Sequence, residues 1–150
     1  MLIPAGLACK SPGQIFSFTF EVANLEPLGL GADRIVLAQP VAVAGTYVAD
    51  AEGISVRGEL QTAFRTECAR CLKLLEEPIC SAFDVRFHKT SDDDEVYLYE
   101  GDFLDLTNML RDHVLLAIPM KSVCSLSCKG LCQTCGANLN EGDCGCNVQE

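Results

Sequence analysis

The 150-residue sequence has no apolar run long enough to span a membrane, and its first residues lack the basic start and long apolar stretch of a signal peptide. We therefore expect a cytoplasmic protein with no membrane association. Hydrophobic residues make up 49% of the chain, which is enough for a folded core and excludes a disordered tail. The length fits one ordinary domain, or one domain with a small appendage.

Recognisable catalytic patterns are also missing. The only histidines are His88 and His113, and the sequence has no phosphate-binding loop, no Ser/His/Asp order, no Cys/His dyad and no His-x-Glu of a zinc deaminase. We interpret His113 as a hydrogen-bonded histidine on an apolar helix face and His88 as a solvated residue at a strand end. These absences predict a protein that is not an enzyme.

Basic residues are scarce, because 11 lysines and arginines stand against 21 aspartates and glutamates, for a formal net charge of −10. This balance repels a bare phosphate backbone and favours a basic protein partner. An RNA contact stays open, since five basic residues gather near one expected hairpin: Arg57, Arg65, Arg70, Lys73 and Arg86. Alternatively, Glu59, Glu67 and Asp84 neutralise these residues across the strands.

Cysteine, by contrast, is abundant, and eight of the ten cysteines form four short pairs: Cys68/Cys71, Cys124/Cys128, Cys132/Cys135 and Cys144/Cys146. In a reducing compartment such close pairs favour a shared metal ion over disulfides. We predict two structural Zn²⁺ ions, because a site closed by four thiolates leaves no position for a catalytic water. Cys9 and Cys80 stand alone, and we expect them to be buried or half-buried thiols.

The four pairs can be combined in more than one way. The combination that we favour places Cys132, Cys135, Cys144 and Cys146 around one ion, so that Cys68/Cys71 and Cys124/Cys128 share the other. A rival combination joins Cys124/Cys128 with Cys132/Cys135, and Cys68/Cys71 with Cys144/Cys146. A third possibility is one filled site with the other cysteines free. The favoured combination predicts that the tail is stapled to the hairpin.

Periodicity predicts the elements of an α+β fold. We expect a loop over residues 1–14, strands over 15–22, 34–49 with a break near Pro40, 54–66, and from about 78 to 87, then an acidic loop at 92–95 and a short strand at 95–99. Cys68 and Cys71 fall at the tip of a hairpin. A helix follows over 106–118, capped by Asp105 and stopped by Pro119.

Residues 120–150 contain few large apolar side chains and would need a metal to fold. The expected architecture is therefore a curved antiparallel β-sheet with one main helix over residues 1–119, followed by a small zinc-binding C-terminal extension over 120–150. Gly136, which follows Cys135 directly, supplies the left-handed backbone that a cysteine turn often requires.

Two segments, "ECARCLKLLEEP" and "LLAIPMKSVCSLSCKGLCQTCGANLNEGDCGC", resemble the bacterial YceD family, also described as a domain of unknown function. The resemblance implies a cytoplasmic, non-enzymatic factor in ribosome biogenesis that supports the accumulation of 23S ribosomal RNA. It also implies a ribosomal protein or a pre-ribosomal particle as partner. All eight paired cysteines match the cysteine pattern of the family, and we expect them to be metal ligands.

Two other functions stay open. A zinc-dependent enzyme acting on RNA would need a set of three cysteines and a free coordination position. A thiol redox sensor would release its zinc and form disulfides on mild oxidation.

Overall fold

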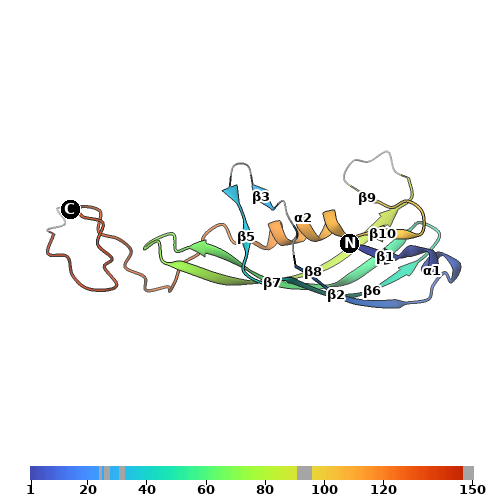
Figure 1. Ribbon diagram of the computed structural model, residues 1–150, viewed down its shortest axis with the longest axis horizontal. Helices are drawn as coiled ribbons and strands as arrows, with labels where there is room; N and C mark the ends of the chain where they lie inside the picture. The colour runs from blue at the N-terminus through green and yellow to red at the C-terminus, as the bar shows by residue number, and fades with distance from the viewer. Residues whose placement is uncertain (24, 26–27, 31–32, 91–95, 147–150) are drawn as a thin grey trace.

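The computed structural model describes residues 1–23, 25, 28–30, 33–90 and 96–146. The order of elements along the chain is β1 (Leu2–Pro4), α1 (Ala5–Lys10), β2 (Phe16–Val22), β3 (Gly29–Leu30), β4 (Asp33–Arg34), β5 (Val36–Leu37), β6 (Val41–Ala49), β7 (Ile54–Glu67), β8 (Leu74–His88), β9 (Tyr97–Leu98), β10 (Phe103–Asp105) and α2 (Thr107–Ala117) (Figure 1). The expected acidic loop at 92–95 lies outside the described residues.

One open, mostly antiparallel sheet dominates the fold. Its strands follow the order β2-β6-β7-β8-β9, with β9 parallel to β8, and β5 pairs with β7 beyond the end of β6. Strands β7 and β8 form a long hairpin whose paired register runs from Ile54 opposite Phe87 to Glu67 opposite Leu74. The α+β class with a mainly antiparallel sheet is thus confirmed.

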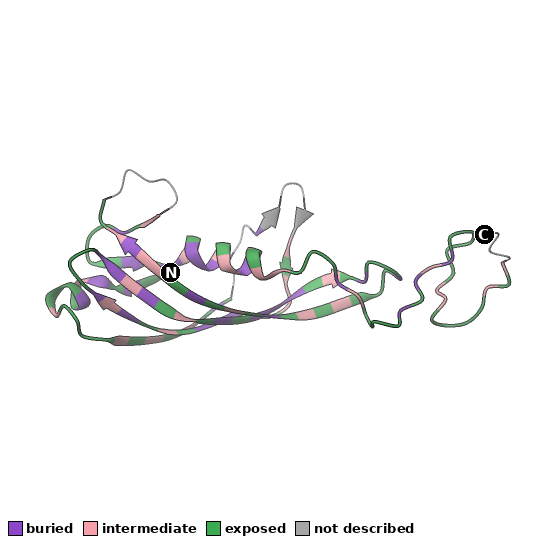
Figure 2. Ribbon diagram, turned by 180° about the vertical axis from the view of Figure 1, so that it is seen from behind, coloured by how far each residue is buried: buried purple, intermediate pink, exposed green. Residues whose placement is uncertain are grey.

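The core lies on one face of this sheet. Alternate residues of β7, among them Val56, Leu60 and Phe64, are buried on that face, as the periodicity predicts. Helix α2 covers the same face with Met109 and Val114. Figure 2 shows buried residues gathered in the half of the molecule beneath the helix, while the β7–β8 hairpin extends beyond it toward the C-terminal tail.

The expectation of a loop over residues 1–14 is wrong, because these residues form β1 and α1. Strand β1 pairs with β10, and Ala5 and Ala8 of α1 are fully buried. A helix of six residues has too few turns to show an apolar period, and the burial of two alanines leaves no strong local signal.

Strand β8 begins at Leu74, four residues before the expected start, and it includes Pro78. The carbonyl of Ala63, which lies opposite Pro78, accepts the N–H of Ala38 and so points away from β8. The nitrogen of Pro78 therefore faces the outer edge of the sheet, where a missing donor removes no bond to β7. The expected break near Pro40 is confirmed, since it separates β5 from β6.

Helix α2 matches the expected helix within one residue at each end. The N-cap is Leu106 and not Asp105 as expected, although the carboxylate of Asp105 accepts the backbone N–H of Thr107 at 2.9 Å. Pro119 follows the helix end. Among the described residues, no helix is both long and apolar enough to cross a membrane. After α2 the described chain, up to Cys146, forms only turns and an isolated bridge between Leu131 and Asn138.

Candidate metal centres

The eight paired cysteines gather in two groups of four. We call Cys68, Cys71, Cys124 and Cys128 the hairpin group, and Cys132, Cys135, Cys144 and Cys146 the tail group; within each group all four sulfur atoms lie within 4.8 Å of one another. The structure therefore follows the favoured combination of pairs and not the rival one.

The sulfur spacing fits a tetrahedral ion. In the hairpin group the Sγ atoms of Cys68 and Cys128 are 3.9 Å apart, and those of Cys71 and Cys124 are 3.6 Å apart. A zinc ion with four thiolates at its usual bond length separates neighbouring sulfur atoms by about 3.8 Å. All ten cysteines are free thiols. The residues present thus suit a four-thiolate metal site in both groups.

The turn between β7 and β8 aims the first two cysteines of the hairpin group. The backbone N–H of Cys68 donates to the carbonyl of Lys73 at 2.8 Å, and the N–H of Leu72 donates to the carbonyl of Cys68 at 2.9 Å. Leu72 takes a left-handed backbone with φ of 58°. This tight loop directs the N–H of Arg70 at the Sγ of Cys68, 3.5 Å away.

The tail group repeats the same turn. The N–H of Cys132 donates to the carbonyl of Ala137 at 2.8 Å, and the N–H of Gly136 donates to the carbonyl of Cys132 at 2.9 Å. Gly136 takes a φ of 74°, which confirms its expected left-handed role. Both Cys-x-x-Cys segments are thus presented by the same pair of backbone hydrogen bonds and a left-handed fifth residue.

Several contacts fasten the tail to the hairpin tip. The N–H of Ala69 donates to the carbonyl of Ser122 at 2.8 Å, and the N–H of Leu131 donates to the carbonyl of Arg70 at 3.1 Å. The guanidinium of Arg70 donates to the carbonyl of Cys128 at 2.9 Å. The hairpin group therefore sits inside a junction that backbone hydrogen bonds also hold.

The thiols of the hairpin group differ in acidity. The backbone N–H of Cys124 lowers the pKa of Cys68 to about 6. The neighbouring Cys128 thiol and burial raise the pKa of Cys124 to about 12. Four negative charges at this spacing repel one another, so that thiols without a cation share protons. A divalent cation replaces those protons and removes the repulsion.

The tail group shows the same division of charge. The backbone N–H of Cys135 lowers the pKa of Cys132 to about 6, whereas the Cys135 and Cys144 side chains, together with burial, raise the pKa of Cys146 to about 12. In both turns the pKa of the first cysteine is therefore lowered. Donors at the turn stabilise its thiolate.

The two groups differ in their surroundings. Cys68, Cys71 and Cys128 are buried, and the apolar side chains packed against them are Leu75, Val123 and Leu131. In the tail group only Cys132 is buried.

Sequence reasoning missed the role of Asn140, which lies in the loop between the two halves of the tail group. Its side-chain amide donates to the Sγ of Cys128 in the hairpin group at 3.4 Å. A paired Asn-x-Asn at 138–140 between two cysteine pairs was the available signal. Its target, however, depends on tertiary placement.

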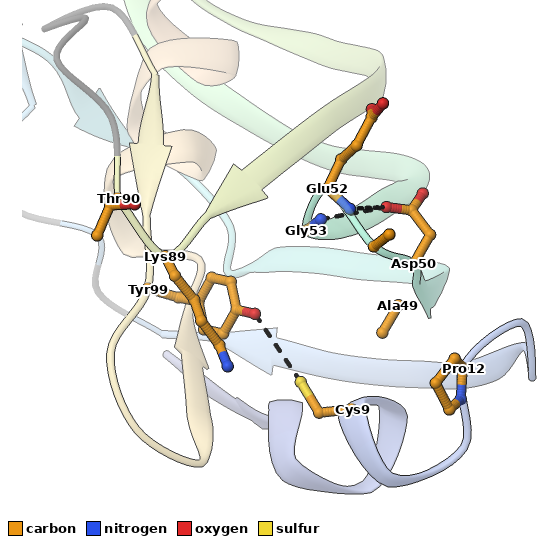
Figure 3. A pocket seen from close by; sticks show the side chains of 10 residues that line it. Cys9, Pro12, Ala49, Asp50, Glu52, Gly53, Lys89, Thr90 and Tyr99 are labelled. Atoms are coloured by element: carbon orange, nitrogen blue, oxygen red, sulfur yellow. Dashed lines mark hydrogen bonds between the residues drawn. The ribbon is translucent and has the colours of Figure 1, made fainter.

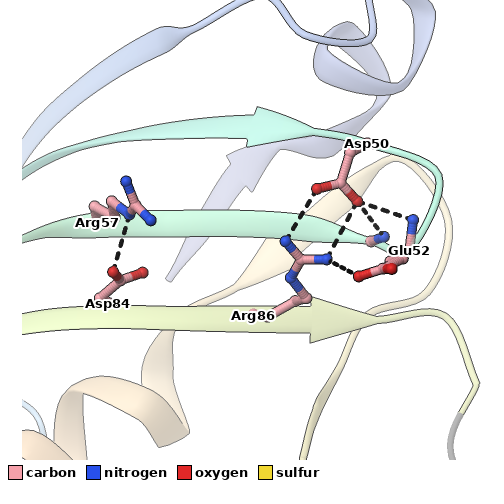
Figure 4. A network of polar contacts seen from close by, with 6 residues as sticks. Asp50, Glu52, Arg57, Asp84 and Arg86 are labelled. Atoms are coloured by element: carbon pink, nitrogen blue, oxygen red, sulfur yellow. Dashed lines mark hydrogen bonds and ion pairs between the residues drawn. The ribbon is translucent and has the colours of Figure 1, made fainter.

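The basic residues near the hairpin are mostly engaged, as Figure 4 shows for part of the sheet. Arg57 pairs with Asp84 at 3.0 Å and Arg65 with Glu76 at 3.1 Å, in each case directly across the β7–β8 ladder. Arg70 is committed to the tail. Cross-strand neutralisation is thereby favoured over a free basic patch, but of the three acidic residues expected to supply it, Asp84 alone takes part in the described ion pairs, and Glu76 faces Arg65 in place of Glu59 or Glu67.

Arg86 bridges Asp50 and Glu52 in the turn between β6 and β7 (Figure 4). The backbone N–H of Glu52 and the Arg86 guanidinium lower the pKa of Asp50. Lys73 is exposed and forms no ion pair with another residue of the described part of the chain. Arg70 forms no described ion pair either, but its guanidinium donates to two backbone carbonyls, so that Lys73 alone of the five has neither kind of side-chain partner among the described residues.

His113 does not have the hydrogen bond that we expected. Its Nε2 is buried and has no hydrogen-bond partner among the described residues, and its ring stacks on Phe83 at a centroid distance of 5.9 Å. Burial against this apolar surface lowers the pKa of His113. His88 is half-buried at the end of β8.

A pocket of about 330 Å³ is lined by Cys9, Asp50, Lys89 and Tyr99, among others (Figure 3). The Sγ of Cys9 lies 3.8 Å from the hydroxyl of Tyr99, and burial raises the pKa of Tyr99 to about 12. The ten lining residues include no recognisable pair of nucleophile and base. Cys9 and Cys80 are both exposed, so the expectation of buried thiols is wrong.

Comparison with known proteins identifies the family to which these cysteine turns belong. The sequence profile of the large ribosomal RNA subunit accumulation protein YceD matches residues 56–150, a segment that contains both cysteine groups. The chain belongs to the YceD family. The resemblance seen in the cysteine motifs is thus confirmed. No solved structure matches the chain.

The relatives that are similar to this chain match stretches of different length. An uncharacterised protein of Mycobacterium tuberculosis is 28% identical over 139 residues, 87% of this chain and 66% of that protein. The uncharacterised protein YlbN of Bacillus subtilis is 31% identical over 121 residues, 77% of this chain and 69% of that protein. The chain thus spans just under two thirds of the mycobacterial relative.

A plant relative carries a functional name. The chloroplastic large ribosomal RNA subunit accumulation protein YCED homolog 1 of Zea mays is 41% identical over 71 residues, 45% of this chain and 22% of that protein. Similarity to named YceD relatives therefore covers part of each chain.

Proposed function

We propose that this protein is a non-enzymatic ribosome-biogenesis factor that supports the accumulation of 23S ribosomal RNA. Membership of the YceD family, whose description names accumulation of large-subunit ribosomal RNA, carries this proposal. Relatives from plants bear the same name. We also propose a cytoplasmic location, as in the bacterial family that the cysteine motifs resemble.

Each cysteine group holds one structural Zn²⁺ ion in this proposal, with the eight ligands Cys68, Cys71, Cys124, Cys128, Cys132, Cys135, Cys144 and Cys146. The spacing of the sulfur atoms supports it, as does the turn that is repeated in both groups. When bound, zinc would cross-link the segments that supply its ligands. The extension over 120–150 would depend on these cross-links for its fold, whereas residues 1–119 have their own core.

The partner is a ribosomal protein or a pre-ribosomal particle, and this acidic chain contacts mainly a basic protein surface of that partner. The net charge of −10 supports this choice, because an acidic protein attracts a basic partner. Arg57, Arg65 and Arg86 do not offset this attraction locally, since each already faces a carboxylate. Ribosomal RNA would be repelled by most of the surface, and Lys73 is the basic residue best placed for a local RNA contact.

The enzymatic and redox alternatives have less support. A catalytic zinc needs an open coordination position, and four sulfur atoms converge in each group. A redox sensor needs accessible ligand thiols, whereas three of the four in the hairpin group are buried.

Depletion of the protein in cells tests the ribosomal role. We expect the amount of 23S relative to 16S ribosomal RNA to fall, and expression of the wild-type chain to restore it. The tagged chain should co-purify ribosomal proteins or pre-ribosomal particles. Expression of Cys80→Ser, which alters an exposed thiol outside both groups, is the control for cysteine substitution and should also restore the ratio fully in the depleted cells. An unchanged ratio after complete depletion would contradict the proposal.

Native mass spectrometry of the metal-replete protein tests the metal assignment independently. Two zinc ions per chain are expected. One ion would remove one of the two sites, and none would remove both.

A further inference from the structure

Asn140 connects the two cysteine groups through its side chain. It belongs to the loop that runs from Cys135 to Cys144, and the tail group holds both ends of this loop together. Its amide Nδ2 nevertheless donates to the Sγ of Cys128 in the hairpin group at 3.4 Å. Its Oδ1 accepts the backbone N–H of Lys129 at 2.8 Å. One side chain thus belongs to one group and hydrogen-bonds a ligand of the other.

The loop fixes the orientation of this amide. The side-chain oxygen of Asn138 accepts both the backbone N–H of Asn140, at 3.1 Å, and its Nδ2, at 2.8 Å. The Nδ2 of Asn138 in turn donates to Glu141 at 2.8 Å. The N–H of Leu139 donates to the carbonyl of Gly130 at 3.0 Å, which holds the loop against the segment between the groups.

The hydrogen bond from the Asn140 amide to the Cys128 sulfur holds this ligand in position for the ion. Loss of such a partner around a metal site typically lowers metal affinity by about 10-fold to 100-fold. The donor, however, is in place only while the loop is closed.

We propose that Asn140 couples the two metal sites, so that an ion in the tail group raises the metal affinity of the hairpin group about tenfold. Because binding free energies are reciprocal, an ion in the hairpin group raises the affinity of the tail group by the same factor. This coupling rests on the proposed binding of metal by both groups. Asn140 acts as a positioning residue, since it touches a ligand and not the ion.

Asn140→Asp is the informative variant. Aspartate has the same shape and keeps the oxygen that accepts the Lys129 N–H, but it places a carboxylate oxygen beside the Cys128 sulfur in place of the donor. Asn140→Ala removes all three side-chain hydrogen bonds, to the Lys129 N–H, the Cys128 sulfur and the Asn138 oxygen, without adding charge. Asn108→Asp makes the same chemical change on the exposed side of α2 and is the matched control.

Cadmium NMR of the full chain measures each site separately, because cadmium replaces zinc among thiolates and each site gives its own resonance. The Cys144→Ser/Cys146→Ser double variant, which cannot close the tail group, identifies the resonance of the hairpin group. Titration with a chelator then gives the cadmium affinity of the hairpin group in four proteins: the wild type, Asn140→Asp, the double variant, and the combination of all three substitutions.

We expect Asn140→Asp and the double variant each to lower the cadmium affinity of the hairpin group about tenfold. The combined variant should bind cadmium in the hairpin group as tightly as the double variant does, within a factor of about two. Asn140→Ala should follow Asn140→Asp in direction, and Asn108→Asp should match the wild type. An equal loss from Asn140→Asp with and without the tail group would overturn the coupling. So would an unchanged affinity in both backgrounds.

The outcomes also separate this coupling from the proposed metal sites. If the wild type gives two resonances and the affinities prove independent, the metal assignment stands and the coupling is wrong. If neither group gives a resonance, both are wrong.

Discussion

The two cysteine groups are built from the same turn, but they join very different lengths of chain. In the hairpin group, Cys71 and Cys124 are separated by 53 positions and belong to a β-hairpin and a C-terminal tail. In the tail group, all four cysteines lie between Cys132 and Cys146. The same local chemistry therefore makes a long-range cross-link in one case and closes a short loop in the other.

Their surroundings reinforce this difference. The hairpin group has a small apolar cluster, backbone hydrogen bonds between hairpin and tail, and the guanidinium of Arg70 around it. In the tail group Cys132 alone is buried, Cys135 is exposed, and Cys144 and Cys146 are half-buried. The comparison implies that damage to the hairpin group unfolds both the hairpin tip and the tail, whereas damage to the tail group unfolds only the tail and reaches the hairpin group through the lost Asn140 contact.

The largest effect is expected from Cys71→Ser. Loss of this ligand opens the site that joins hairpin and tail, and loss of a structural metal is among the most destabilising single changes, on the order of 4 kcal/mol. Hydrogen exchange of the zinc-loaded protein should show lost protection both at the β7–β8 tip and over residues 120–146. Cys80→Ser on the exposed face of β8 should leave both unchanged. Protection lost only in the tail would mean that the cross-link does not support the hairpin.

A smaller and more local effect is expected from Cys132→Ser. The tail loop should lose its exchange protection, because residues 129–146 have few other contacts to hold them. Strands β6, β7 and β8 should keep theirs, and their thermal midpoint should fall by no more than about 5 °C, the shift that a tenfold loss of hairpin-group affinity accounts for. Equal loss in the sheet would show that the two groups stabilise one unit and would remove the contrast between them.

Sequence spacing favoured the observed grouping of the cysteines but left a rival combination and a single filled site open, because short pairs do not show which pairs meet in space. The hairpin, its cysteine tip and the left-handed Gly136 also follow from local patterns. Of the arginine partners, Asp84 was expected, but the pairing of Arg65 with Glu76 was not, since it requires the register of two long strands. The same limit applies to Arg70 and Asn140, whose targets are residues distant in sequence.

The third effect concerns Arg70, which ties the tail to the hairpin without being a ligand. Arg70→Met keeps much of the side-chain length but removes the hydrogen bonds to the carbonyls of Leu126 and Cys128. Because these bonds are partly exposed, we expect a loss of about 1 kcal/mol in unfolding free energy. Arg57→Met, which breaks only an exposed ion pair, is the control and should cost less. Thermal melts of both zinc-loaded variants provide the measurement, and equal losses would contradict a specific role for Arg70.

The smallest effect comes from the one position at which the two turns differ in backbone strain. The left-handed residue is Leu72 in the hairpin turn, with φ of 58°, and Gly136 in the tail turn, with φ of 74°. A side chain in this conformation costs about 1–2 kcal/mol, whereas the extra freedom of glycine in the unfolded chain costs roughly 0.5–1 kcal/mol. Leu72 is 58% exposed and has little packing to lose, so Leu72→Gly should stabilise the hairpin site by about 0.5 kcal/mol.

Gly136→Ala should have the opposite sign. A Cβ at this position meets no atom within 4 Å, so the substitution tests backbone strain without a steric clash. We expect a loss of about 1 kcal/mol. The chelator concentration that removes half of the metal from each site reports both changes. If both substitutions weakened their sites, the left-handed conformation of Leu72 would not be a source of strain, because its side-chain contacts would then outweigh the backbone cost at the hairpin tip.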